Sequence, residues 1–134
     1  MFKKNKYSSI DTLIDGTMNI RGNMTFAGGI RLDGKLVGSL TLSDGAHGTL
    51  IMGEKSKITG DIITDSAIIA GEVKGNIQAT EFLELHSTAK ILGDIEYSTI
   101  EIHAGAKING QLIEVKKNKL NKKNLENKEV KNDK

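Results

Sequence analysis

The sequence of 134 residues contains no cysteine, no proline and no tryptophan, and aromatic residues make up only 4% of it. Without cysteine the chain forms neither disulfides nor thiolate metal sites. No apolar run approaches the roughly 18 to 20 residues that a membrane-spanning helix needs, and no apolar stretch follows the first lysines. We therefore expect neither a membrane span nor a secretory signal, which favours a cytoplasmic protein. The lack of proline leaves nearly every backbone N–H available for hydrogen-bonded ladders.

Charge is spread unevenly along the chain. Residues 1–9 carry a net charge of +3 and residues 116–134 a net charge of +5, whereas residues 10–115 carry eight basic and fourteen acidic side chains. An acidic body is a poor nucleic-acid binder, and the lysine-rich segment has no aromatic residue on which bases could stack, so we expect no nucleic-acid partner. Both basic segments lack the apolar content of a core, and we expect them to be disordered tails.

One short phrase recurs through the body: an apolar residue, any residue, glycine, any residue and another apolar residue. Its six copies lie at 20–24, 36–40, 58–62, 73–77, 91–95 and 108–112. The six glycines are 16, 22, 15, 18 and 17 residues apart, so a unit of about seventeen residues is repeated. Self-similarity at such a period indicates an architecture in which each unit buries its apolar side against its neighbours.

The units have the pattern of β-strands. Residues 83–91 align without a gap over residues 100–108, and each segment begins with two apolar residues that alternate with a glutamate. Alternation of this kind indicates half-buried strands rather than helices. The sequence therefore predicts an all-β solenoid of about six coils over residues 10–115, with equivalent strands stacked in parallel. We expect the repeated glycine to face the core or to sit at a corner, and the insertion at 43–48 to be a surface loop.

Three segments, at 32–38, 50–62 and 83–95 with its copy, together resemble the bactofilins, which are bacterial cytoskeletal proteins. The short flanking tails are similar as well, and the resemblance covers roughly residues 10–115. It implies a right-handed parallel β-helix that assembles into non-polar filaments beneath the cytoplasmic membrane without nucleotide. It also implies a scaffold in cell shape, division or polar organisation, with cell-wall-modifying enzymes among its partners.

The ends of the predicted solenoid favour the same function on physical grounds. A terminal coil leaves its strand edges and apolar core open on one side, and soluble solenoids usually cover them with a polar cap. The sequence offers no amphipathic helix before the first coil, and the last coil runs directly into the lysine-rich tail. We therefore predict self-association through like ends, with Ile108, Leu112 and Ile113 near one contact. The alternative is a non-polymerising soluble adaptor whose tails fold over its ends.

The N-terminal tail is a candidate membrane-binding segment. Met1 and Phe2 can enter the headgroup boundary, while Lys3, Lys4 and Lys6 each add about 1 kcal/mol near an anionic leaflet. This is weak binding for one chain, but many such anchors along a filament act together. The predicted location is therefore the inner face of the cytoplasmic membrane. The alternative is an ordinary disordered start of the chain.

Candidate chemical sites are few. His86 and His103 occupy equivalent positions in adjacent coils and could hold Zn²⁺, but a third ligand is needed. Glu84 and Glu101 lie on the same coils and form a carboxylate pair of the kind that glycosidases use, yet the short loops build no cleft. Stacked polar residues are what repetition produces by default. We therefore expect no catalytic residue, no metal site and no cofactor.

A left-handed hexapeptide acyltransferase is the remaining enzyme alternative, because its coils also contain about eighteen residues. That fold places aliphatic residues at strict intervals of six, whereas the steps from Ile91 onward are 4, 5, 2, 6 and 4. The spacing therefore disfavours an acyltransferase, and the chain is not expected to be an enzyme.

Overall fold

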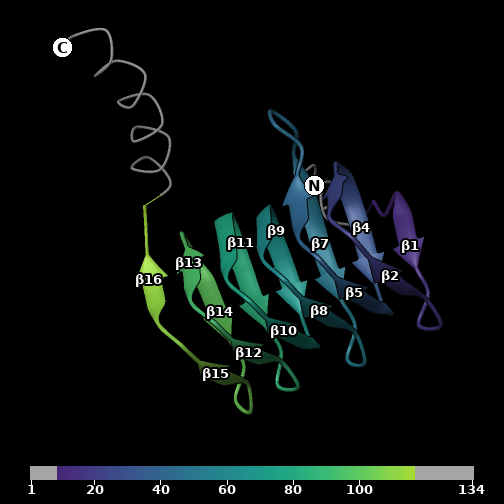
Figure 1. The fold of residues 1–134 in the computed structure, drawn as a ribbon. Coiled ribbons are helices and arrows are strands. Elements are labelled where there is room, and N and C mark those ends of the chain that lie inside the picture. The colour runs from purple at the N-terminus through teal and green to yellow at the C-terminus, as the bar shows by residue number, and fades with distance from the viewer. Residues whose placement is uncertain (1–8, 117–134) are drawn as a thin grey trace, which may run out of the picture.

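The computed structural model describes residues 9–116 and shows a rod of stacked β-coils (Figure 1). The strands are β1 (Thr12–Ile14), β2 (Asn19–Arg21), β3 (Met24–Phe26), β4 (Gly28–Leu32), β5 (Lys35–Val37), β6 (Leu40–Leu42), β7 (Gly48–Met52), β8 (Lys57–Thr59), β9 (Ile62–Ile69), β10 (Glu72–Lys74), β11 (Ile77–Leu85), β12 (Lys90–Leu92), β13 (Ile95–Tyr97), β14 (Ile100–Ile102), β15 (Lys107–Asn109) and β16 (Leu112–Glu114). No helix occurs within the described residues, so none there is long and apolar enough to cross a membrane.

The strands form a six-stranded sheet and a ten-stranded sheet, and every strand pair is parallel. The six-stranded sheet has the order β15-β12-β10-β8-β5-β2. The ten-stranded sheet provides two further flanks. The β4 flank contains β1, β4, β7, the second parts of β9 and β11, and β14. The β6 flank contains β3, β6, the first parts of β9 and β11, β13 and β16.

Each coil therefore passes once through all three flanks, and the chain completes six coils within the described residues. They begin at Thr12, Gly28, Gly48, Ser66, Phe82 and Ile100. The predicted all-β parallel solenoid of about six coils is confirmed. Its strands run from Thr12 to Glu114, inside the predicted 10–115. Apart from Ser9 and Lys116, the predicted tails lie outside the described residues.

The core consists of aliphatic columns that run along the rod. In the three-residue strands of the six-stranded sheet the middle residue points inward, because successive side chains of a strand alternate between its two faces. One column stacks Leu36, Ile58, Val73 and Ile91, all at most 2% exposed. Burial of each such side chain contributes about 1.5–3 kcal/mol. Each sequence repeat thus contributes one residue to each column.

The repeated glycines sit at the corner where each coil leaves the six-stranded sheet for the β6 flank, as predicted. All six have φ between +126° and +158°, which residues with a Cβ rarely adopt. The coils also approach each other closely there: a Cβ on Gly93 would overlap the carbonyl oxygen of Gly75 in the preceding coil. Residues 43–47 form the predicted loop between β6 and β7, although Gly48 already belongs to β7.

Candidate polymerisation surfaces

The C-terminal end of the rod exposes positions that are buried in the core in the four coils before it. Ile100, Ile102, Ile108 and Leu112 of the last coil lie in register with Leu83, Leu85, Ile91 and Ile95 of the coil before. The four residues of the inner coil are 0% exposed, whereas Ile102 is 42% and Leu112 is 44% exposed. Ile100 and Ile108 are half-buried. The two sets occupy the same position in their coils, and no further coil covers the last one within residues 9–116, which accounts for the difference.

The backbone is open at the same place. Within residues 9–116, β14, β15 and β16 each pair with a strand on one side only. Edges of this kind present unpaired N–H and C=O groups and are templates for another chain. The end surface formed by Ile100, Ile102, Ile108 and Leu112 therefore combines an apolar centre with three strand edges.

The N-terminal end differs in chemistry. β1, β2 and β3 also pair on one side only within the described part of the chain. However, Ile14 and Phe26 of the first coil are only 7% and 8% exposed, and Met24 is partly buried. Met18, in the turn after β1, is 46% exposed. The two ends therefore offer different surfaces to a partner.

The structure separates the three residues that the sequence predicts near an end contact. Ile108 and Leu112 belong to the C-terminal end surface. Ile113 instead lies in register with Glu96 on the outside of the β6 flank, where it lines a shallow groove with Ile63. Adjacent strand residues face opposite sides of the sheet, so Leu112 and Ile113 cannot both belong to the apolar centre of the end surface. That any of the three contacts another subunit stays a prediction.

Sequence reasoning missed Ile100 and Ile102 as end residues. The seventeen-residue offset that places them over Leu83 and Leu85 is visible in the sequence and was the available signal. The predicted membrane-binding residues, Met1, Phe2, Lys3, Lys4 and Lys6, lie outside the described residues.

The outer surface of the six-stranded sheet is strongly basic. Of the eight basic side chains in residues 10–115, six lie at the outward positions of its strands: Arg21, Lys35, Lys57, Lys74, Lys90 and Lys107. Glu72 is the only acidic residue in these strands, and its carboxylate lies 4.0 Å from the ammonium group of Lys74. We call this face the basic surface. This surface is not evident from the sequence, because residues 10–115 as a whole carry a net negative charge.

Lysines stack on each other within the basic surface. Lys35 lies in register with Lys57, and Lys90 with Lys107, one coil apart. Like charges on directly opposed positions of neighbouring strands are destabilising. An anionic partner that lies along this face would relieve the repulsion.

The two candidate chemical pairs are close together in the structure. Glu84 and Glu101 lie in register on the outside of the β4 flank, and the rings of His86 and His103 are 4.9 Å apart between centroids. Glu84 Oε2 lies 3.2 Å from His86 Nε2 and 2.7 Å from His103 Nε2. Glu84 is therefore engaged with both imidazoles on an outer flank of the rod.

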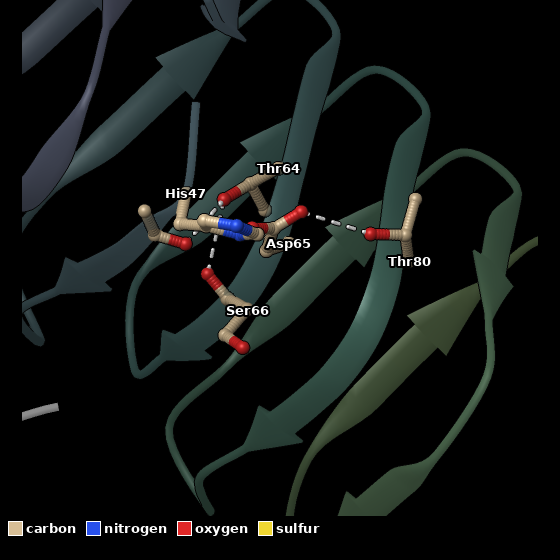
Figure 2. Close-up of polar contacts among 6 residues, drawn as sticks. His47, Thr64, Asp65, Ser66 and Thr80 are labelled. Atoms are coloured by element: carbon tan, nitrogen blue, oxygen red, sulfur yellow. Dashed lines mark hydrogen bonds and ion pairs between the residues drawn. The ribbon is translucent and has the colours of Figure 1, made fainter. Parts of the chain in front are cut away.

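Two further groups have partners that the sequence did not reveal. His47 in the inserted loop faces Asp65, with Nδ1 3.1 Å from Oδ2, and Thr80 donates a hydrogen bond to the other carboxylate oxygen (Figure 2). The Arg31 guanidinium makes two 3.0 Å hydrogen bonds to Asp33, which raise the pKa of Arg31. The Arg31 guanidinium is thus engaged with a carboxylate of its own coil.

Comparison with known proteins agrees with this architecture. Residues 12–113 match the family described as "Bactofilin: Polymer-forming cytoskeletal". Bactofilin BacP of Myxococcus xanthus (strain DK1622) is 32% identical over 106 residues, which cover 78% of this chain and 42% of BacP. Bactofilin BacO of the same strain is 27% identical over 111 residues, covering 83% of this chain and 85% of BacO. This chain thus spans less than half the length of BacP.

A filament structure provides the three-dimensional match. The cryo-EM reconstruction of Thermus thermophilus bactofilin double helical filaments is similar with a TM-score of 0.70 and 27% sequence identity, over 78% of this chain and 99% of that one. The family match covers most of the solenoid, and the fold is that of a protein that forms filaments. The chain therefore belongs to the bactofilin family of polymer-forming cytoskeletal proteins.

Proposed function

We propose that this chain is a cytoskeletal scaffold, not an enzyme, that assembles end to end into non-polar filaments without nucleotide. The observation that carries the proposal is the end surface, where Ile102 and Leu112 are 42% and 44% exposed although their counterparts Leu85 and Ile95 are 0% exposed. A second copy placed on this surface buries the apolar centre and covers the strand edges. Neither step requires a bound ligand, which supports assembly without nucleotide.

The difference between the two ends supports non-polar filaments. A two-fold contact between C-terminal ends joins two equally bare apolar surfaces, and a second two-fold contact between N-terminal ends leaves the chain of subunits open. A head-to-tail contact would instead join the bare C-terminal surface to an end where Ile14 and Phe26 are already buried. Like ends therefore offer the better match in apolar surface.

Negative-stain electron microscopy of the purified full chain, without nucleotide, tests assembly. We expect filaments from the wild type and none from Leu112→Arg, because the arginine places a charge in the centre of the apolar contact. Ile63→Arg is the matched control, since Ile63 is 40% exposed but lies on the outside of a middle coil, in register with the uncharged Thr41 and Gln78. Long filaments from Leu112→Arg, or none from the wild type at high concentration, would contradict the proposal.

We further propose that the filaments lie against the inner face of the cytoplasmic membrane. The basic surface supports this, because it is a regular β-sheet face with six cationic side chains, and it recurs in every subunit. Juxtamembrane lysines and arginines contribute about 1 kcal/mol each near an anionic leaflet. Weak contacts repeated along a filament add up to stable attachment. The N-terminal Met1 and Phe2 with their lysines are a second candidate anchor.

Vesicle co-sedimentation separates the two anchors. We expect the full chain to pellet with vesicles that contain phosphatidylglycerol and not with phosphatidylcholine alone. A Δ2–6 variant that still pellets assigns attachment to the basic surface, and one that does not pellet assigns it to the N-terminal tail. Equal recovery on both vesicle types would exclude electrostatic attachment.

The cellular role that follows is a scaffold in cell shape, division or polar organisation, with cell-wall-modifying enzymes as recruited partners. This part of the proposal rests on family membership, and on a rod that exposes long flanks for recruitment. A fluorescent fusion of the wild type should form discrete membrane-proximal structures, whereas the Leu112→Arg fusion should be diffuse. A diffuse wild-type fusion that still supports normal morphology would count against the role.

A further inference from the structure

Four potential metal ligands converge on the outside of the last two coils. Glu84 and Glu101 are in register at the outward positions of β11 and β14, and His86 and His103 immediately follow these strands. Besides its contacts with Glu84, His103 Nε2 lies 3.5 Å from Glu101 Oε2. The ligand atoms of Glu84, His86 and His103 all lie within 4.8 Å of one another.

These separations fit a small tetrahedral ion. Zinc binds imidazole nitrogen and carboxylate oxygen at about 2.0–2.2 Å, so adjacent ligand atoms of a tetrahedral site are about 3.3–3.6 Å apart. Glu84 Oε2 is 3.2 Å from His86 Nε2 and 2.7 Å from His103 Nε2. Small rotations of half-exposed side chains therefore suffice to admit the ion.

The backbone holds the two imidazoles one coil apart. The N–H of His86 donates to the carbonyl of Ile69 at 2.8 Å, and the N–H of His103 donates to the carbonyl of Leu85 at 2.9 Å. Each histidine also opens the same tight turn, in which its carbonyl accepts the N–H of the alanine three residues later. Equivalent turns in adjacent coils thus place the two rings at equivalent positions, with their planes tilted by 53°. This reduces the ordering that a metal would require.

We propose that Glu84, His86 and His103 form a Zn²⁺ site, with Glu101 as the fourth ligand. This replaces our expectation from the sequence that the chain has no metal site, because the structure supplies the missing third ligand. The ion neutralises two carboxylates that otherwise stack as like charges one coil apart. Since the ligands come from both coils, the metal clamps the last coil to the one before it. Metal binding itself does not depend on filament formation.

The clamp acts on the coil that bears the C-terminal end surface. Ile102 belongs to that surface and directly precedes His103, so ordering His103 restrains the adjoining edge. If the end surface makes the proposed filament contact, bound zinc favours a terminal coil that is ready to assemble. This consequence rests on the proposed function, whereas the metal site stands on the ligand geometry alone.

Zinc titration of the full chain, by calorimetry and by competition with a chromogenic chelator, tests the site. We expect one Zn²⁺ per chain and an affinity that falls at least about tenfold in His103→Gln and in Glu84→Gln. The glutamine at 103 retains an N–H donor for Glu84 but is a poor zinc ligand. His47→Gln is the matched control, because His47 belongs to the other potential group, with Asp65 and Glu81.

Co²⁺ provides a readout that a merely structural role of these residues would not change. The Co²⁺-loaded wild type should show the intense visible absorption of a tetrahedral site, absent from His103→Gln and present in His47→Gln. Circular dichroism of each variant verifies that its β-structure is intact, and His86→Gln replaces any variant that fails to fold. No zinc uptake by the wild type, unchanged affinity in His103→Gln, or loss confined to His47→Gln would each overturn the site. Filament formation by zinc-free protein leaves the site intact and removes only its role in assembly.

Discussion

At the residue scale, the tightest constraints fall on the glycines at the corner between the six-stranded sheet and the β6 flank. Their positive φ values already disfavour other residues, and five of them also lie directly over the carbonyl of the glycine one coil earlier. Gly22 is the exception, because its coil is the first of the part of the chain that the structure describes, and a Cβ there would meet nothing within 4 Å. A substitution at Gly22 therefore measures the cost of backbone strain alone, without the steric overlap that the other five glycines would add.

Gly93→Ala should destabilise the fold more than Gly22→Ala. Both substitutions incur backbone strain of about 1–3 kcal/mol, since both glycines have positive φ. The overlap at Gly93 adds at least about 1 kcal/mol, in the range typical of overpacking. Urea unfolding of the two variants measures the difference. Equal losses would show that the coils separate freely at this corner.

Asp15 gives a residue-scale prediction for pH. The hydroxyl and the N–H of Thr17 donate hydrogen bonds to its carboxylate at 2.7 and 3.0 Å, and these bonds lower the pKa of Asp15 below its ordinary 3.8. A lowered pKa stabilises the fold above the unfolded pKa, and this stabilisation is lost as the pH falls through the folded value. Asp15→Asn should therefore shrink the stability difference between pH 6 and pH 3. An unchanged difference would show that the hydrogen bonds do not persist in solution.

At the element scale, the six-stranded sheet contributes to the core on its inner face and forms the basic surface on its outer face, because successive residues of a strand point to opposite faces. The middle residue of each strand builds the core, while the outward neighbours build the basic surface. Lysines stacked one coil apart lower stability, as between Lys35 and Lys57. Glu72 separates Lys57 from Lys90, so the repulsion occurs at two places, Lys35 with Lys57 and Lys90 with Lys107, and an anionic partner would relieve both. Because the strands of the basic surface bear no aromatic residue, lipid headgroups fit it better than nucleic-acid bases.

Lys57→Glu should weaken binding to phosphatidylglycerol vesicles by about 2 kcal/mol, or roughly thirtyfold, since a reversal removes one attraction and adds one repulsion. Lys55→Glu is the matched control, because it makes the same charge change two residues away, in the exposed turn before β8. The control should lose clearly less. Equal losses would indicate that net charge, rather than the basic surface, governs attachment.

At the scale of the whole molecule, the rod has an interior that repeats and two ends that do not match. The same aliphatic columns that stabilise the middle coils become the exposed surface of the last coil. The proposed filament is therefore a continuation of the packing that folds the monomer. This explains how a chain with short connecting turns can assemble without a dedicated binding domain.

The size of the particles that Leu112→Arg forms distinguishes non-polar from polar filaments. If like ends meet, the variant loses only the C-terminal contact and sedimentation should show dimers joined at their N-terminal ends. If subunits join head to tail, the same variant should be monomeric. Met18→Arg, at the other end, should turn the dimers into monomers when combined with Leu112→Arg. Dimers that survive both substitutions would place the contact on a flank.

The strands, the number of coils and the apolar positions of the core could be predicted from the sequence alone, because each depends on alternation and on glycine spacing within one repeat. Where coils differ in length, the neighbours in adjacent coils follow from packing and became visible only in the tertiary structure. Only where two coils align without a gap, as residues 83–91 do over 100–108, does the repeat itself predict the register. The tertiary structure placed Ile113 on a flank, Ile102 at the end, and Glu84 between two histidines. It also gathered basic residues that lie 14 to 22 positions apart on one face. Side-chain contacts between coils join residues distant in the chain, and a repeat predicts which residues are neighbours but not how their side chains meet.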